Sequence, residues 1–164
     1  MKLLEWLARA SAIVAGLILI ALTLMTGYSV IGRDFFGKAL LGDFELTAVM
    51  TGAAIALFLP WCQVKRGNII VDFFTSRASD QTRSALDRIG ALFISVMMGL
   101  CAWRATLGGL SAYKSNSGTM MLGFPEWIVY SFIVPGLTIT ALIALVQALR
   151  GLDAFDVKGG ELPQ

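Results

Sequence analysis

Few residues in this sequence have the type and spacing that chemistry requires. Histidine is absent, which excludes His-ligated haem, His-bearing zinc sites and Ser-His-Asp or Cys-His catalysis. The two cysteines, Cys62 and Cys101, form no CxxC pair and are expected to be free, buried thiols. The polar run 115–119 lacks the GxxxxGK(S/T) pattern of a phosphate loop. We therefore predict no cofactor, no bound metal or nucleotide, and no enzymatic activity.

The composition limits the class of protein further. The chain has 164 residues, of which 57% are hydrophobic and 15% are charged, whereas a soluble domain has about 25% charged residues. So few polar residues cannot cover the surface of a soluble globular protein of this size. The apolar content also excludes a disordered chain. The net charge is only +2, without a basic block, so nucleic acid is not expected as a partner.

Four apolar runs are the predicted helices that position the few polar residues of the chain. Three of them, 10–32, 46–64 and 127–149, contain no charge and reach the roughly 20 helical residues that a bilayer requires. The other starts at Ile89 and is expected to continue past Arg104. The first run is longer than the h-region of a signal peptide, so we predict a retained helix. The sequence thus predicts an all-α integral membrane protein, with a four-helix transmembrane domain over 1–150 and a polar cytoplasmic tail over 151–164.

Basic residues predict the orientation. Nine of the 13 lysines and arginines lie in the N-terminal tail, the segment 65–88 and the C-terminal tail, which alternate with the other two loops. Because basic residues favour the cytoplasmic side, we predict cytoplasmic termini in a bacterial inner membrane protein. Between the second and third helices, Phe73 and Phe74 belong to an apolar cluster that is expected to lie at the cytoplasmic interface.

Arg104 is the only charged residue inside the predicted spans. It follows Arg88 by roughly 22 Å of helix rise, which puts it toward the outer leaflet. Two interpretations stay open: its side chain snorkels to the interface beside Trp103, or it forms an ion pair with an acid from an outer loop or a partner. Direct contact with a transported substrate is the weakest interpretation, because coupled carriers usually place carboxylates or broken polar helices near the midplane.

Small residues and prolines mark the helix surfaces. Ala48, Gly52 and Ala56 form a small-xxx-small stripe, which lets helices approach closely in lipid. The stripe either packs inside this chain or forms a groove for a partner. Pro60 and the pair Pro135–Gly136 are expected to kink the second and fourth helices.

The order of these features resembles the small membrane subunit (small permease, DctQ-like) of TRAP transporters, the tripartite ATP-independent periplasmic carriers of bacteria. Arg33 closes the first run and Glu45 opens the second. The matching stretches are Lys-Arg-Gly-Asn-Ile-Ile-Val-Asp at 65–72, Leu-Gly-Phe-Pro-Glu-Trp-Ile-Val-Tyr at 122–130 and Ile-Val-Pro-Gly at 133–136. One departure is Asn68, where the family most often has histidine.

The resemblance implies a division of labour. A large membrane subunit would hold the substrate and sodium sites and move as an elevator, while a periplasmic substrate-binding protein would capture a carboxylate such as a four-carbon dicarboxylate. This chain would be a scaffold in the lipid bilayer beside the large subunit. The candidate contact residues are Glu45, Ala48, Gly52, Ala56, Phe73, Phe74 and Arg104. The alternative is a structural or regulatory four-helix membrane protein that assembles with a different partner.

Overall fold

The computed structural model describes residues 2–37, 40–65, 80–151 and 155. Its four long helices are α1 (Lys2–Phe36), α2 (Asp43–Val64), α4 (Asp80–Ser115) and α5 (Glu126–Arg150). All four are long and apolar enough to cross a membrane, which confirms the predicted spans. The continuation of the third span past Arg104 is also confirmed, because α4 runs unbroken to Ser115. The predicted interfacial segment, with Phe73 and Phe74, lies outside the described residues.

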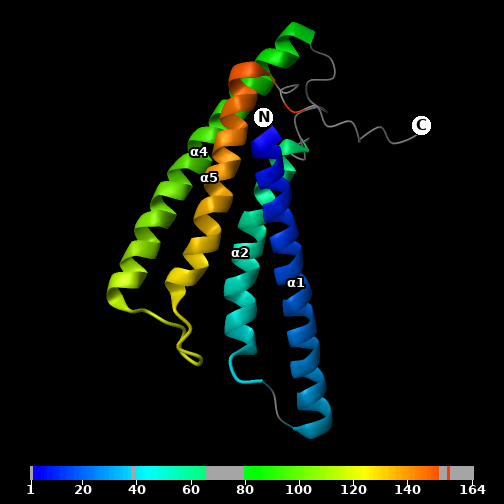
Figure 1. The fold of residues 1–164 in the computed structure, drawn as a ribbon, viewed down its shortest axis with the longest axis vertical. Coiled ribbons are helices and arrows are strands. Elements are labelled where there is room, and N and C mark those ends of the chain that lie inside the picture. Colours follow the sequence, from blue (N-terminus) through cyan, green and yellow to red (C-terminus); the bar gives the residue numbers. More distant parts are fainter. Residues whose placement is uncertain (1, 38–39, 66–79, 152–154, 156–164) are drawn as a thin grey trace, which may run out of the picture.

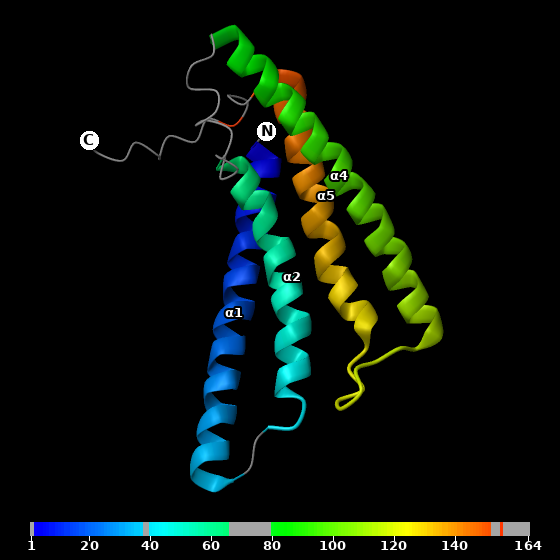
Figure 2. The same cartoon turned by 180° about the vertical axis from the view of Figure 1, so that it is seen from behind.

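The helices lie in a row rather than in a closed bundle (Figures 1 and 2). Helix α2 packs between α1 and α5, and α5 packs between α2 and α4. We name the two ends by the predicted orientation: the outer end carries the connection from α1 to α2 and loop 116–125, and the inner end carries the N-terminus. Because α1 and α4 form the two edges of this slab, both keep wide apolar surfaces uncovered.

Small side chains form the seam between α4 and α5. The buried residues of α4 on this side are Ala91, Ser95, Ala102 and Ala112. A methyl group added at Gly109 would lie 2.8 Å from the Cβ atom of Tyr130 on α5. Tyr130 therefore fills the space that a side chain at position 109 would need. The Ser95 hydroxyl donates to the Ala141 carbonyl across the seam, at 3.0 Å. Small residues therefore set the close approach of these helices, as they do in membrane bundles generally.

Two small apolar clusters join α1, α2 and α5. One contains Ala15, Ala54 and Leu57. The other, at the inner end, contains Ala8, Val64, Ile143 and Phe155. Phe155, which falls in the predicted tail, is only 4% exposed. An aromatic side chain in the tail gains apolar contacts when it folds back onto the helix ends.

A close approach between α2 and α5 involves Pro60 and Gly136. Pro60 has no N–H, so the Ala56 carbonyl lacks its usual helical donor. Gly136 lies against this carbonyl, and a Cβ atom at position 136 would be 2.8 Å from the Ala56 carbonyl carbon and closer still to its oxygen. A Cα hydrogen of Gly136 therefore points to the freed oxygen, the geometry of a weak C–H···O contact.

A pair of glutamines connects the same two helices near the inner end. The Gln63 side-chain amide donates to the Gln147 side-chain oxygen at 2.7 Å. The Gln147 side-chain amide donates to the Gln63 backbone carbonyl at 3.0 Å. Both side chains are buried. Polar groups in an apolar setting must be hydrogen-bonded, so this pair favours one register of α2 against α5.

Candidate functional site

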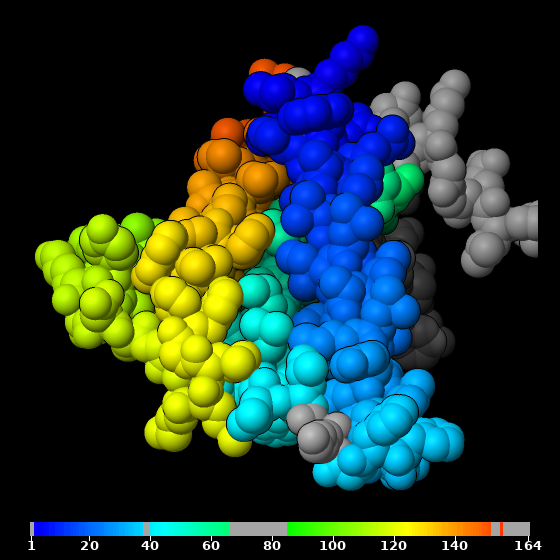
Figure 3. All heavy atoms as spheres, turned by 60° about the horizontal axis from the view of Figure 1, so that its bottom comes forward, coloured from blue at the N-terminus to red at the C-terminus, as the bar shows by residue number. Residues whose placement is uncertain are grey.

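Glu45 fastens the outer loop 116–125 to the start of α2. Its carboxylate accepts hydrogen bonds from the backbone N–H of Met121, at 3.0 and 3.1 Å, and from that of Leu122, at 3.3 Å. Leu122 also covers Gly42, the N-cap of α2, whose φ of 78° favours glycine. Figure 3 shows this loop in yellow beside the start of α2 in cyan. Glu45, predicted to contact a partner, thus already holds two backbone groups of its own chain.

The loop itself has a defined geometry. The Thr119 N–H donates to the Phe124 carbonyl at 3.1 Å, and the Gly123 N–H donates to the Thr119 carbonyl at 2.9 Å. Gly118 pairs with Pro125 in an isolated antiparallel bridge. Met120 at the tip is fully exposed. The result is a tight loop that presents a flexible apolar side chain at the outer end.

The stripe on α2 divides between two environments. Ala56 is 6% exposed and packs against Gly136 of α5. Ala48 and Gly52 are exposed, and a Cβ atom built at Gly52 would have no neighbour within 4 Å. The two interpretations of the stripe therefore apply to different residues: Ala56 packs inside the chain, whereas Ala48 and Gly52 leave a shallow, uncovered surface.

Arg104 lies on the exposed side of α4. Trp103, beside it, is 62% exposed, and Leu107, one turn further, is 44% exposed, so Arg104 has exposed apolar neighbours on α4. Two acids at the outer end are already engaged: Glu45 with the loop amides, and Asp43 with the Ser29 hydroxyl and the Phe44 N–H. Neither serves as the predicted ion-pair partner of Arg104.

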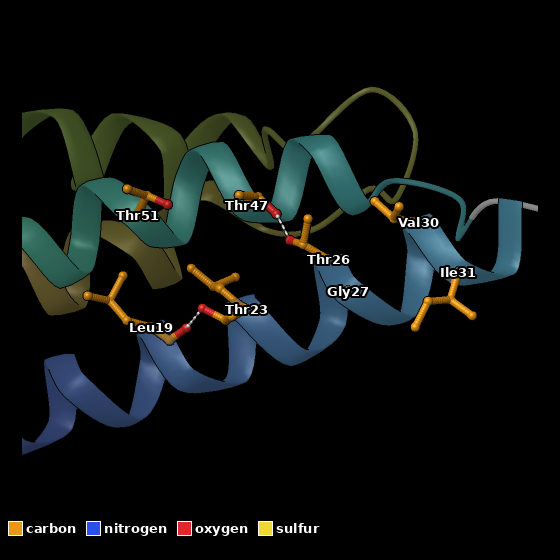
Figure 4. Close-up of a pocket in the computed structure, with 9 residues that line it drawn as sticks. Leu19, Thr23, Thr26, Gly27, Val30, Ile31, Thr47 and Thr51 are labelled. Carbon is orange, nitrogen blue, oxygen red and sulfur yellow. Dashed lines mark hydrogen bonds between the residues drawn. The ribbon is translucent and has the colours of Figure 1, made fainter. Parts of the chain in front are cut away.

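A groove of about 560 Å³ runs between α1 and α2 in their outer halves (Figure 4). Its lining is apolar or threonine, and three of its four threonines, Thr23, Thr26 and Thr47, form hydrogen bonds within the chain. The Thr23 hydroxyl donates to the Leu19 carbonyl at 2.8 Å, and the Thr26 and Thr47 hydroxyls are 3.5 Å apart. All lining residues are uncharged. The groove therefore suits an acyl chain better than a carboxylate or a sodium ion.

The remaining predicted features have mixed outcomes. Pro60 and Pro135 both lie inside continuous helices, and the kinks stay a prediction. Cys62 and Cys101 are free, as expected, but both are exposed rather than buried. The prediction of buried thiols was wrong because an apolar side chain in a membrane helix can face lipid as readily as protein.

Several residues that join the helices were missed from sequence. Gln63 and Gln147 were not singled out, although two uncharged amides within apolar runs are a signal of helix pairing. The α4 seam was also missed, although small residues recur there at helical spacing, at Ala91, Ser95 and Ala102. Gly136 was assigned only to a kink, and its contact with Ala56 required the packed structure.

The fold and these surfaces define the class: a multi-pass membrane protein whose helices are built for close packing. A family model described as tripartite ATP-independent periplasmic transporters, DctQ component, matches residues 22–154. The chain belongs to this family and is thus the small component of a TRAP transporter, in a family of transporter components rather than enzymes. No curated protein and no solved structure gives a significant match.

Proposed function

We propose that this chain is the scaffold subunit of a sodium-coupled, binding-protein-dependent secondary transporter for carboxylates, such as four-carbon dicarboxylates. It stabilises the large permease subunit, and a periplasmic substrate-binding protein delivers the substrate. The uncovered small-residue surface at Ala48 and Gly52 carries the proposal. In a chain of the DctQ family, such a surface suits close contact with another membrane helix.

The slab shape supports a stationary role. An elevator carrier requires one part that stays fixed in the bilayer while another part slides. Hydrogen bonds and close contacts across the Gln63–Gln147 and Gly136–Ala56 pairs hold α2 and α5 in one register. The groove between α1 and α2 has an uncharged lining, so the substrate and sodium sites are assigned to the large subunit.

Arg104 is proposed as a second contact with the large subunit. A charge on the lipid-facing side of a span costs free energy unless it is paired or reaches the interface. Asp43 and Glu45 are engaged within the chain, and an acidic side chain of the partner is the proposed counter-ion. Phe73 and Phe74 are proposed to brace the complex at the cytoplasmic interface.

Reconstitution tests the scaffold role. The large subunit and the binding protein are placed in proteoliposomes with or without this chain, and sodium-driven uptake of the carboxylate is measured. We expect uptake to fall at least tenfold without the chain, because the sliding part loses its fixed support. Equal uptake by the large subunit alone would refute the scaffold role, and uptake by this chain alone would refute an accessory role.

The proposed orientation makes a separate prediction. Both termini are placed in the cytoplasm of a bacterial cell, on the side that carries nine of the 13 basic residues. Alkaline phosphatase, which requires export for activity, should be active when fused after Lys38 or Ser117. It should be inactive when fused after Arg77 or Lys158. The reverse pattern of activities would show that the orientation is the opposite of the proposed one.

A further inference from the structure

Two basic side chains from different helices meet on one indole ring at the inner end. The Arg9 guanidinium carbon of α1 lies 5.6 Å from the centre of the Trp61 ring. The Lys65 ammonium, just after α2, lies 5.2 Å from the same ring centre. Both distances are typical of cation–π contacts. We call these three residues the basic–indole cluster.

Packing against the apolar cluster and a backbone hydrogen bond hold Trp61 and Lys65 in place. Trp61 is partly buried and packs against the inner cluster of Ala8, Val64, Ile143 and Phe155. The Lys65 N–H donates to the Trp61 carbonyl at 3.0 Å, which fixes the backbone where the lysine side chain begins. The ring is therefore a firm platform that brings two like charges within about 11 Å of each other.

The charges themselves stay open to a ligand. Arg9 and Lys65 are both exposed, and the structure gives each of them a ring face as its partner. A ring quadrupole attracts a cation but does not neutralise it. Two positive charges at the edge of an apolar slab repel each other, so an anion at this position relieves the repulsion. Tryptophan and basic residues at a helix end also mark the level of the lipid headgroups.

We propose that the basic–indole cluster binds the phosphate headgroup of an anionic phospholipid. Arg9 and Lys65 contact the phosphate oxygens, and the apolar surface of α1 and α2 accommodates the acyl chains. The site is formed by this chain alone and does not rest on the proposed transport function. Only its assignment to the cytoplasmic leaflet, which is rich in anionic lipid in many membranes, rests on the proposed orientation.

Lipid titration of the purified full-length chain in a neutral detergent tests this proposal. The probes are phosphatidylglycerol, cardiolipin, phosphatidylethanolamine and soluble glycerol phosphate, and Kd is followed by native mass spectrometry. We expect phosphatidylglycerol and cardiolipin to bind at least tenfold more tightly than phosphatidylethanolamine. In the double variant Arg9→Gln, Lys65→Gln, the Kd for phosphatidylglycerol should rise about thirtyfold, since each basic residue near an anionic surface contributes about fivefold.

Matched variants separate the site from general charge and from folding. Arg9→Lys with Lys65→Arg keeps both charges and should leave Kd within about twofold. Arg33→Gln with Lys114→Gln removes the same charge from the outer end and should also leave Kd unchanged. The proposal is overturned if the inner double variant binds phosphatidylglycerol as the unmodified chain does, or if the outer variant loses binding equally. Glycerol phosphate binding as tightly as the lipid would show a site for a free anion instead.

Discussion

Replacing Gly136 with leucine is expected to prevent the chain from reaching its folded state. The new side chain would start 2.8 Å from the Ala56 carbonyl carbon and 3.2 Å from the Leu57 nitrogen. Both are backbone atoms of α2, so neither can move aside as a flexible side chain would. The substitution also removes the C–H···O contact with the freed Ala56 carbonyl. We expect a loss of stability at or beyond the upper end of the about 1–3 kcal/mol seen for overpacked cores.

The measurement is the yield of folded chain in membranes and its Tm in detergent, over the series Gly136→Ala, Gly136→Val and Gly136→Leu. Stability should fall in that order, because each step adds bulk against the same backbone. Gly52→Leu is the matched control: it adds the same side chain to the same helix pair at a position with open space. If Gly136→Leu kept the unmodified Tm, the close approach of α2 and α5 would be wrong.

Gly52→Leu is expected to leave the isolated chain folded but to abolish its assembly with the large subunit. Its side chain meets nothing within 4 Å inside the chain, so the Tm should stay within about 2 °C, as for most surface substitutions. Leucine on the uncovered surface would separate α2 from a partner helix that requires close approach. Co-purified large subunit and sodium-driven uptake should both fall at least tenfold.

The control for this prediction is Gly16→Leu, which adds the same bulk to α1 at another position without neighbours within 4 Å. It should leave both assembly and uptake unchanged. Normal co-purification of the Gly52→Leu chain would show that the uncovered α2 surface is not part of the interface. Equal losses with Gly16→Leu would mean that added bulk anywhere on the slab disturbs the complex, and that α2 has no special role.

The sequence by itself determined the spans and the family. Length and apolar content are local properties, so four helices follow from runs of uncharged residues and from the cost of unpaired backbone groups in lipid. A helix of this kind continues past a single arginine, which is why the extension of the third span through Arg104 was predictable. The ordered motifs at 65–72 and 122–136 were enough to identify the DctQ family, which the match over residues 22–154 confirms.

The tertiary structure decided which surface of each helix is covered. Apolar residues occur all around these helices, so hydropathy does not distinguish a lipid-facing side from a packed one. For that reason the exposure of Cys62 and Cys101 was predicted wrongly, and the stripe on α2 could not be divided between Ala56 and Gly52. The burial of Phe155 and the pairing of Glu45 with the outer loop are contacts between residues distant in the chain. Such contacts depend on the relative position of two elements, which no single stretch of sequence specifies.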